Sequence, residues 1–281
     1  MKIAKFEVNL NPTMREFELM NYLDRRIFRE TAKERFTKLD HDYIYKKFNE
    51  EEFPIEGNNL LSSYIFKFLE DNYEYLKRKN EIILVDIGAA GGALTTIFAL
   101  KALNSLKLLE KTKIILVDVA KQALYSTQVG NFNLTKEFIA VYNLGDFGSN
   151  GKDIKSILSK AKYYCSDLLK LPQDLKDVDI CITGFTHHHL NLLDKELACK
   201  EMERITRENG FIGIVDESLN YKQYTKWLKQ HKNETNFRNE LVPIAQESFI
   251  TLDEHISLFS SIVVINKMNS KKYYCFWGVK K

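Results

Sequence analysis

The sequence predicts an α/β fold with a mostly parallel seven-stranded sheet, an antiparallel C-terminal hairpin and a helical N-terminal region. Two short β-branched runs, 82–85 and 114–117, are separated by an apolar helical segment at 93–106. Two buried strands joined by one helix are typical of a parallel sheet that is covered on both faces. A glycine-rich turn at 88–92 follows the first run, and strands continue to alternate with helices beyond the second. This organisation is Rossmann-like.

Residues 1–80 precede this alternation, and we expect them to form a helical cap or lid. The stretch 13–48 has a helical pattern, and a break that contains proline and glycine follows at 53–59. Over 60–79, apolar side chains recur every three or four residues, which gives a helix one apolar face. Residues 81–281 then form the Rossmann-like domain.

After the second strand, the predicted elements continue in the same alternating order. Strands are expected over 161–165, 178–183 and 211–215, a helix over 195–208 that ends at the cap pair Asn209-Gly210, and hairpin strands over 261–265 and 273–279. The stretch between Asp118 and Asp167 is longer than one helix and one turn require. Part of residues 130–160 is therefore expected to be an insertion, which either lies over a bound ligand or decorates the surface.

The composition argues against several classes of protein. The chain has 281 residues, of which 44% are hydrophobic and 28% charged, as is usual for soluble globular proteins. A net charge of +3 does not indicate a nucleic-acid or membrane partner. No stretch approaches the ~18 apolar residues of a membrane span, and the N-terminus has no apolar signal region. The four cysteines have no zinc-binding spacing, so we expect reduced thiols in a cytoplasmic protein, with homo-oligomerisation left open.

Three consecutive predicted strands end in a carboxylate, namely Asp86, Asp118 and Asp167. In an open α/β sheet, ligands bind outside the carboxyl ends of the strands, and glycines there let the backbone approach a ligand closely. An acid after the second strand can accept both hydroxyls of a ribose, and one after the third can accept the exocyclic amine of adenine. Asp86 can hold an ammonium group, whereas it would repel the pyrophosphate of a dinucleotide. The pattern fits a nucleoside that carries an amino acid.

Five motifs carry a resemblance to a known family. They follow one another over residues 81–218 as ILVDIGAAGGALT, KIILVDVA, YYCSDLLKLP, DICITGFTHHHL and EMERITRENGFIGIVDE. In their order and spacing they resemble the strand-end motifs of class I S-adenosylmethionine-dependent methyltransferases, and the terminal hairpin is similar to that family's antiparallel last strand. The turn GAAGG departs from the family's G-x-G-x-G pattern, because Ala90 replaces a glycine.

The resemblance implies S-adenosyl-L-methionine as the cofactor and methyl transfer as the activity. The cofactor-binding residues that it implies are Asp86 and Gly88 at the methionine moiety, Asp118 at the ribose, Asp167 with Leu168 at the adenine, Thr183 and Gly184 at the floor near the methyl group, and Ala90, Gly91 and Val119 beside them.

His187, His188 and His189 follow the fourth strand, beside the place expected for the transferred methyl group. A hydroxyl acceptor benefits from a base with a pKa near 7, so His187 and His188 are candidate catalytic bases. The alternative is that these histidines merely form the turn into the next helix. We expect no metal site, because adjacent histidines point in different directions and the other ligands would have to come from elsewhere.

The expected acceptor is a small molecule that is methylated on oxygen, nitrogen or carbon. The fourth strand does not end in a tetrad of the Asn-Pro-Pro-Tyr type, and no basic stripe is present, which argues against nucleic acid. Two alternatives stay open. One is a protein of the same fold that binds the cofactor without methyl transfer, as an accessory subunit or a cyclase. The other is an NAD(P)-dependent oxidoreductase, which Asp86 and the lack of a GxGxxG motif disfavour.

Overall fold

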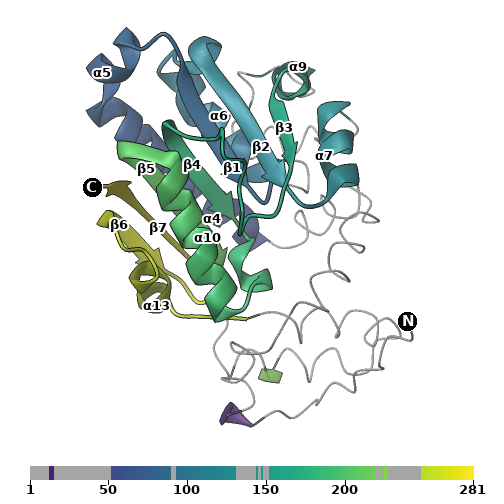
Figure 1. Ribbon diagram of the computed structural model, residues 1–281, viewed down its shortest axis with the longest axis vertical. Coiled ribbons are helices and arrows are strands. Elements are labelled where there is room, and N and C mark those ends of the chain that lie inside the picture. The colour runs from purple at the N-terminus through teal and green to yellow at the C-terminus, as the bar shows by residue number, and fades with distance from the viewer. Residues whose placement is uncertain are drawn as a thin grey trace.

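A single seven-stranded sheet forms the centre of the computed structural model (Figure 1). The structure describes residues 13–15, 52–89, 93–130, 144, 147, 152–218, 222, 225–226 and 248–281. The strands are β1 (Ile82–Ile87), β2 (Thr112–Asp118), β3 (Lys162–Cys165), β4 (Val178–Gly184), β5 (Thr206–Glu217), β6 (Ile262–Asn269) and β7 (Tyr273–Lys280). Their order is β3-β2-β1-β4-β5-β7-β6, with parallel neighbours from β3 to β5 and with β7 antiparallel to both β5 and β6. The predicted fold class is confirmed.

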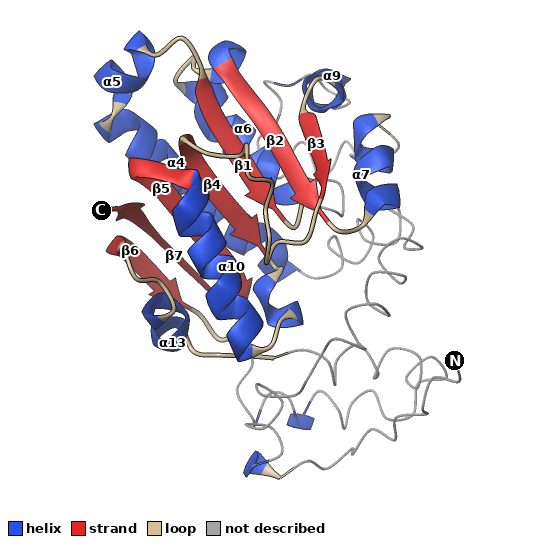
Figure 2. Cartoon of the chain, in the orientation of Figure 1, coloured by secondary structure: helices blue, strands red, loops and turns tan. Residues whose placement is uncertain are grey.

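Helices cover both faces of this sheet (Figure 2). On one face lie α4 (Glu52–Asp71), α6 (Leu94–Ser105), α7 (Lys121–Gln128) and α9 (Lys152–Ser159), and on the other lie α10 (Leu192–Ile205) and α13 (Leu252–Ser257). The short elements are α5 (Tyr73–Arg78), η2 (Leu109–Lys111) and η4 (His187–His189). In the described part of the chain, no helix has both the length and the apolar character that a membrane span needs.

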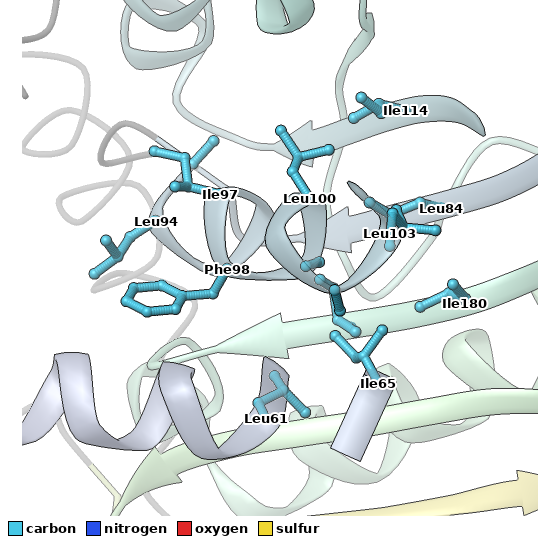
Figure 3. Close-up of a cluster of buried hydrophobic side chains, with 14 of the residues drawn as sticks. Leu61, Ile65, Leu84, Leu94, Ile97, Phe98, Leu100, Leu103, Ile114 and Ile180 are labelled. Atoms are coloured by element: carbon cyan, nitrogen blue, oxygen red, sulfur yellow. The ribbon is translucent and has the colours of Figure 1, made fainter. Parts of the chain in front are cut away.

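The apolar runs form strands that are buried on both faces. Leu84 and Ile180 belong to the hydrophobic cluster on the α4 and α6 side, whereas their neighbours Val85 and Cys181 belong to the cluster on the α10 side. Successive side chains of a strand point to opposite faces, so a strand between two helical layers needs a continuous apolar run. Figure 3 shows the first cluster, in which Leu84 and Ile180 of the sheet face side chains of α4 and α6, among them Ile65.

Helix α4 begins earlier than the sequence predicted, because the expected break at 53–59 lies inside it. Pro54 stands in the first turn, where a helix needs no amide donor. Gly57 lets the helix approach β5, since a Cβ at this position would lie 2.6 Å from Cγ2 of Val215. Residues 52–78, assigned above to a cap, thus share the core of the sheet. Most of residues 1–51 lie outside the described residues, so the predicted cap stays a prediction there.

The predicted helix over 195–208 is wrong at both ends. Helix α10 spans Leu192–Ile205, and the amide of Asp194 donates to the side chain of Asn191, which caps its start. Asn209 has a φ of 56°, as expected for a helix cap, but it lies inside β5 where the register with β4 shifts. Asparagine and glycine adopt this left-handed conformation in β-bulges as well as after helices, so the same pair of residues fits both structures.

Part of the predicted insertion at 130–160 packs into the core. Helix α9 places Ile154 and Leu158 in the cluster that also contains Leu124 of α7, and both side chains are fully buried. Residues 131–143 and 148–151 lie outside the described residues.

Candidate cofactor-binding and active site

The carboxyl ends of β1, β2 and β4 bring the predicted site residues to one edge of the sheet. Ile87 of β1 pairs with Val117 of β2 on one side and with Thr183 of β4 on the other. The amide of Gly88 donates to the carbonyl of Val117 at 2.8 Å, and the hydroxyl of Thr183 donates to the carbonyl of Ile87 at 2.7 Å. These hydrogen bonds fix the start of the turn that follows β1.

Asp86 is the buried acid of this edge. Its side chain is 1% exposed, and its Oδ2 atom accepts a hydrogen bond of 2.6 Å from the hydroxyl of Thr96 in α6. Its Oδ1 atom is also buried, and within the described ranges it has no hydrogen-bond partner. Burial raises the pKa of Asp86 to about 7, Thr96 opposes this rise, and the charge of Asp118 adds to it. A cationic group placed at Oδ1 would both satisfy this oxygen and stabilise the charged carboxylate.

Gly88 is required by its backbone conformation and by a neighbouring loop. Its φ is +78°, and a Cβ would lie 2.2 Å from Oγ1 of Thr186, in the loop after β4. Gly184 is crowded in the same way, because a Cβ there would lie 2.2 Å from Oγ1 of Thr95 in α6. These two predicted site glycines therefore allow segments of the protein to approach one another. Ala90 and Gly91 follow in the turn between Gly88 and α6 and lie outside the described residues.

The two other predicted acids follow β2 and β3. Asp118 ends β2, and its Oδ1 accepts a hydrogen bond of 2.8 Å from the amide of Ala120, across Val119. Asp167 accepts at 2.9 Å from the amide of Leu169, across Leu168. The amide of Ser166 donates to the carbonyl of Asp118 at 3.0 Å, so the two loops are adjacent. Both acids thus order their own turns at the edge where Asp86 is buried.

The histidines after β4 form the short helix η4, which turns His188 toward β5. Nδ1 of His188 donates to Oδ1 of Asp216 at 2.6 Å, and both side chains are buried. Burial would raise the pKa of Asp216, but the charge and hydrogen bond of His188 outweigh it and hold that pKa below its ordinary value. Asp216 therefore fixes the ring of His188 in one orientation.

His187 lies in the core and makes different contacts. Its Nδ1 is 2.9 Å from Nε2 of His255 in α13, and Nδ1 of His255 is 2.7 Å from the hydroxyl of Tyr274 in β7. Burial lowers the pKa of His187 to about 4 and that of His255 well below its ordinary value, so both rings are neutral near pH 7. The turn therefore directs the two candidate bases toward different partners. Of the two, only His188 is hydrogen-bonded to a carboxylate.

Three residues of this region were not predicted as site residues. Asp216 stands near the end of β5, so the strand-end rule that selected the other acids would also have found it. Thr96 lies in the first turn of α6, and its contact with Asp86 has no separate sequence signal. His255 is an isolated histidine far along the chain, and only the folded structure brings it to His187.

Comparisons with known proteins find similar solved structures but no similar sequence. Neither the protein-family models nor the curated protein sequences contain a match. The chain is similar to the solved structure of the N-methyltransferase NodS from Bradyrhizobium japonicum with S-adenosyl-L-homocysteine, at 10% identity over 89% of this chain and 97% of that one, with a TM-score of 0.49. It is also similar to geranyl diphosphate C-methyltransferase from Streptomyces coelicolor, at 10% identity over 78% and 79%, with a TM-score of 0.46. A TehB-like SAM-dependent methyltransferase from Corynebacterium glutamicum shows 8% identity over 77% and 87%, with a TM-score of 0.44.

Proposed function

We propose that this chain binds S-adenosyl-L-methionine at the carboxyl edge of the sheet and transfers its methyl group to a small-molecule acceptor. The observation that carries the proposal is the buried Oδ1 atom of Asp86, which has no partner among the residues described and lies beside the turn after β1. An unsatisfied buried carboxylate oxygen is costly, and the ammonium group of an amino-acid ligand would satisfy it. A pyrophosphate at this position would instead be repelled.

The other residues of the edge support the same ligand. Asp118 follows the strand next to β1, where a carboxylate can accept both ribose hydroxyls. Asp167 and Leu168 follow the next strand and are assigned to the adenine. Thr183 and Gly184 end β4 on the opposite side and are assigned to the floor near the methyl group.

The residues of the chain would act mainly by positioning. When bound, the cofactor supplies an electrophilic methyl group on a positively charged sulfur. Positioning of two reactants accounts for a large part of such catalysis, and the hydrogen bonds of Asp86, Gly88 and Thr183 hold this edge in one conformation. For a hydroxyl acceptor, His188 would take the proton, since Asp216 fixes its ring.

Calorimetry with S-adenosylhomocysteine tests the cofactor assignment. We expect this ligand to bind and NADH to bind far more weakly. Replacement of Asp118 by alanine removes charge-assisted hydrogen bonds worth about 1.5–3 kcal/mol each, so the affinity should fall tenfold or more. The melting temperature of the free protein should stay nearly unchanged, because Asp118 is partly exposed at the end of a strand. Stronger binding of NADH would instead support an oxidoreductase.

A second measurement tests the transfer itself. Incubation of the protein with S-adenosyl-L-methionine and candidate acceptors grouped as hydroxyl, amine and carbon nucleophiles should release S-adenosylhomocysteine with one group. Binding without release for every group would favour a cofactor-binding accessory protein.

A further inference from the structure

We propose that His187, Cys199 and His255 form a zinc site, buried between η4, α10 and α13. One potential ligand atom from each residue lies within 4.8 Å of the other two, and all three side chains are buried. Two imidazole nitrogens and one thiolate are typical zinc ligands, and they make up three of the four ligands of a tetrahedral site. None of the three residues is among those assigned to the cofactor.

His187 has two buried ring nitrogens, and only Nδ1 has a partner among the described residues. Its Nε2 atom is buried, and no hydrogen-bond partner for it occurs in the described part of the chain. A buried polar atom without a partner is rare in folded proteins and costs stability. A zinc ion takes one nitrogen of each ring, so either Nδ1 or, after a flip of the ring, Nε2 of His187 can face the ion.

The contact between the two histidines is already close to the spacing that zinc imposes. Nδ1 of His187 lies 2.9 Å from Nε2 of His255. Zinc–nitrogen bonds of about 2.0–2.1 Å in a tetrahedral site place two ligand nitrogens roughly 3.3 Å apart. A shift of a few tenths of an ångström would therefore admit the ion between them. Burial keeps both rings neutral, which is the form that binds metals.

The outer contacts of His255 also match those of a metal ligand. Its Nδ1 lies 2.7 Å from the hydroxyl of Tyr274, so Nε2 can face the ion while the other ring nitrogen is held. Histidines that bind metals nearly always have such a partner on the second nitrogen, which fixes the tautomer.

The charges around the cluster can accommodate a divalent ion. Burial raises the pKa of Cys199, Glu203 adds to the rise, and the Lys195 ammonium opposes it. A bound metal ion would deprotonate the thiol despite its burial. The thiolate would offset one of the two charges of zinc, and the ammonium of Lys195 donates to the carbonyls of Leu190 and Ser248.

Metal titration of the chelator-treated full chain tests the site. We expect one equivalent of Zn²⁺ to bind and, at a hundredfold excess over Kd, to raise the melting temperature by about 5 °C. Co²⁺ in place of Zn²⁺ should give a sulfur-to-cobalt charge-transfer absorption in the near ultraviolet. Absence of binding, or binding without this absorption, would overturn the proposal.

Two cysteine variants make the test specific. Cys199→Ser should abolish the charge-transfer absorption and weaken zinc binding by more than about 100-fold. Loss of a contact to a ligand already weakens metal binding by as much as about 100-fold, and loss of the ligand itself should cost more. Cys275→Ser is the matched control, because Cys275 is equally buried but lies in the cluster on the opposite face of the sheet. It should retain both signals.

A third variant covers the case in which Cys199→Ser does not fold. Tyr274→Phe keeps all three ligands and should weaken zinc binding by about 10–100-fold while it retains the absorption. An unchanged zinc affinity in Tyr274→Phe, or equal loss of the absorption in both cysteine variants, would contradict the site.

Discussion

Thr96 holds Asp86 by a hydrogen bond of 2.6 Å to Oδ2, while Oδ1 has no partner among the described residues. Burial raises the pKa of Asp86 to about 7, so the carboxyl is partly protonated in the free protein near neutral pH. A ligand ammonium needs the charged form. We therefore expect the affinity for S-adenosylhomocysteine to rise with pH up to about 7, by as much as tenfold per pH unit well below the pKa. Calorimetry in buffers of different ionisation enthalpy should show proton release on binding below pH 7.

A ligand without the amino-acid group provides the control for this pH dependence. Methylthioadenosine has no ammonium group, so its affinity should change little over the same range. Asp86→Asn should remove the pH dependence for S-adenosylhomocysteine. An equal pH dependence for both ligands would show that Asp86 is not at the ammonium.

The same raised pKa predicts how the stability of the free protein changes with pH. In the unfolded chain the pKa of Asp86 lies near the ordinary aspartate value of 3.8, whereas in the folded protein the side chain stays protonated up to about pH 7. Between these values only the unfolded state loses the proton, so the free energy of unfolding falls as pH rises. The full difference is on the order of 4 kcal/mol. Urea unfolding of the wild type and of Asp86→Asn should diverge over this window.

The crowding of Gly88 predicts a larger loss of stability than its positive φ alone would cause. An alanine at this position would place Cβ 2.2 Å from Oγ1 of Thr186, and we expect Gly88→Ala to cost about 2–4 kcal/mol. Gly130 is the matched control, because its φ is also positive, at +69°, but the nearest described atom to a Cβ there is Cδ of Lys155 at 3.4 Å. Gly130→Ala should cost only about 1 kcal/mol. Equal losses in urea unfolding would mean that Thr186 moves away freely.

The sequence predicted the central strands because burial on both faces requires continuous apolar runs. Leu84 and Val85 are neighbours in β1 and lie in the clusters on opposite faces of the sheet. The sequence also predicted Asp86 and Asp118 at one edge, because the ends of parallel strands meet there. The end of α10 was not predictable in this way, since Asn209 and Gly210 fit a bulge in β5 as well as a helix cap. Local sequence determines which conformations these two residues tolerate, and the pairing with β4 selects between them.

The histidine cluster had no sequence signal, because its members are distant in the chain. His187 meets His255 only when α13 packs on the sheet, and Cys199 joins them from α10. The sequence therefore indicated no further ligands near the three adjacent histidines. It also could not tell which histidine faces the core, since that depends on the turn geometry of η4.

Replacement of Asp179 should lower the stability of the protein without weakening cofactor binding. Its buried carboxylate accepts hydrogen bonds from Lys79 at 2.6 Å, from Arg207 at 2.6 Å and from the amide of Ile83 at 2.9 Å. It lies near the amino end of β4, away from the proposed cofactor edge. Asp179→Ala leaves two cations without their partner, so we expect it to lower the free energy of unfolding by about 3–5 kcal/mol.

The exposed ion pair between Lys67 and Asp71 is the control for Asp179. Asp71→Ala should cost less than about 1 kcal/mol, because water screens the pair. Urea unfolding measures both losses, and calorimetry should give the same S-adenosylhomocysteine affinity for both folded variants. Similar losses for the two would show that the Asp179 network adds little.

His188 and His187 should differ in what their replacement removes. If the acceptor is a hydroxyl, His188→Ala should lower kcat by about 10²–10⁴-fold while the affinity for S-adenosylhomocysteine holds, because His188 would take the proton in the transfer step. Asp216→Asn should lower kcat as well, since Oδ1 of Asp216 fixes the ring through the 2.6 Å hydrogen bond. His187→Ala should instead lower the melting temperature and leave kcat largely unchanged, because His187 contacts His255 in the core. Rates of S-adenosylhomocysteine release, measured with the folded variants, separate these effects. Full activity of His188→Ala would exclude the proton-accepting role and indicate an amine or an already acidic acceptor, which needs no base.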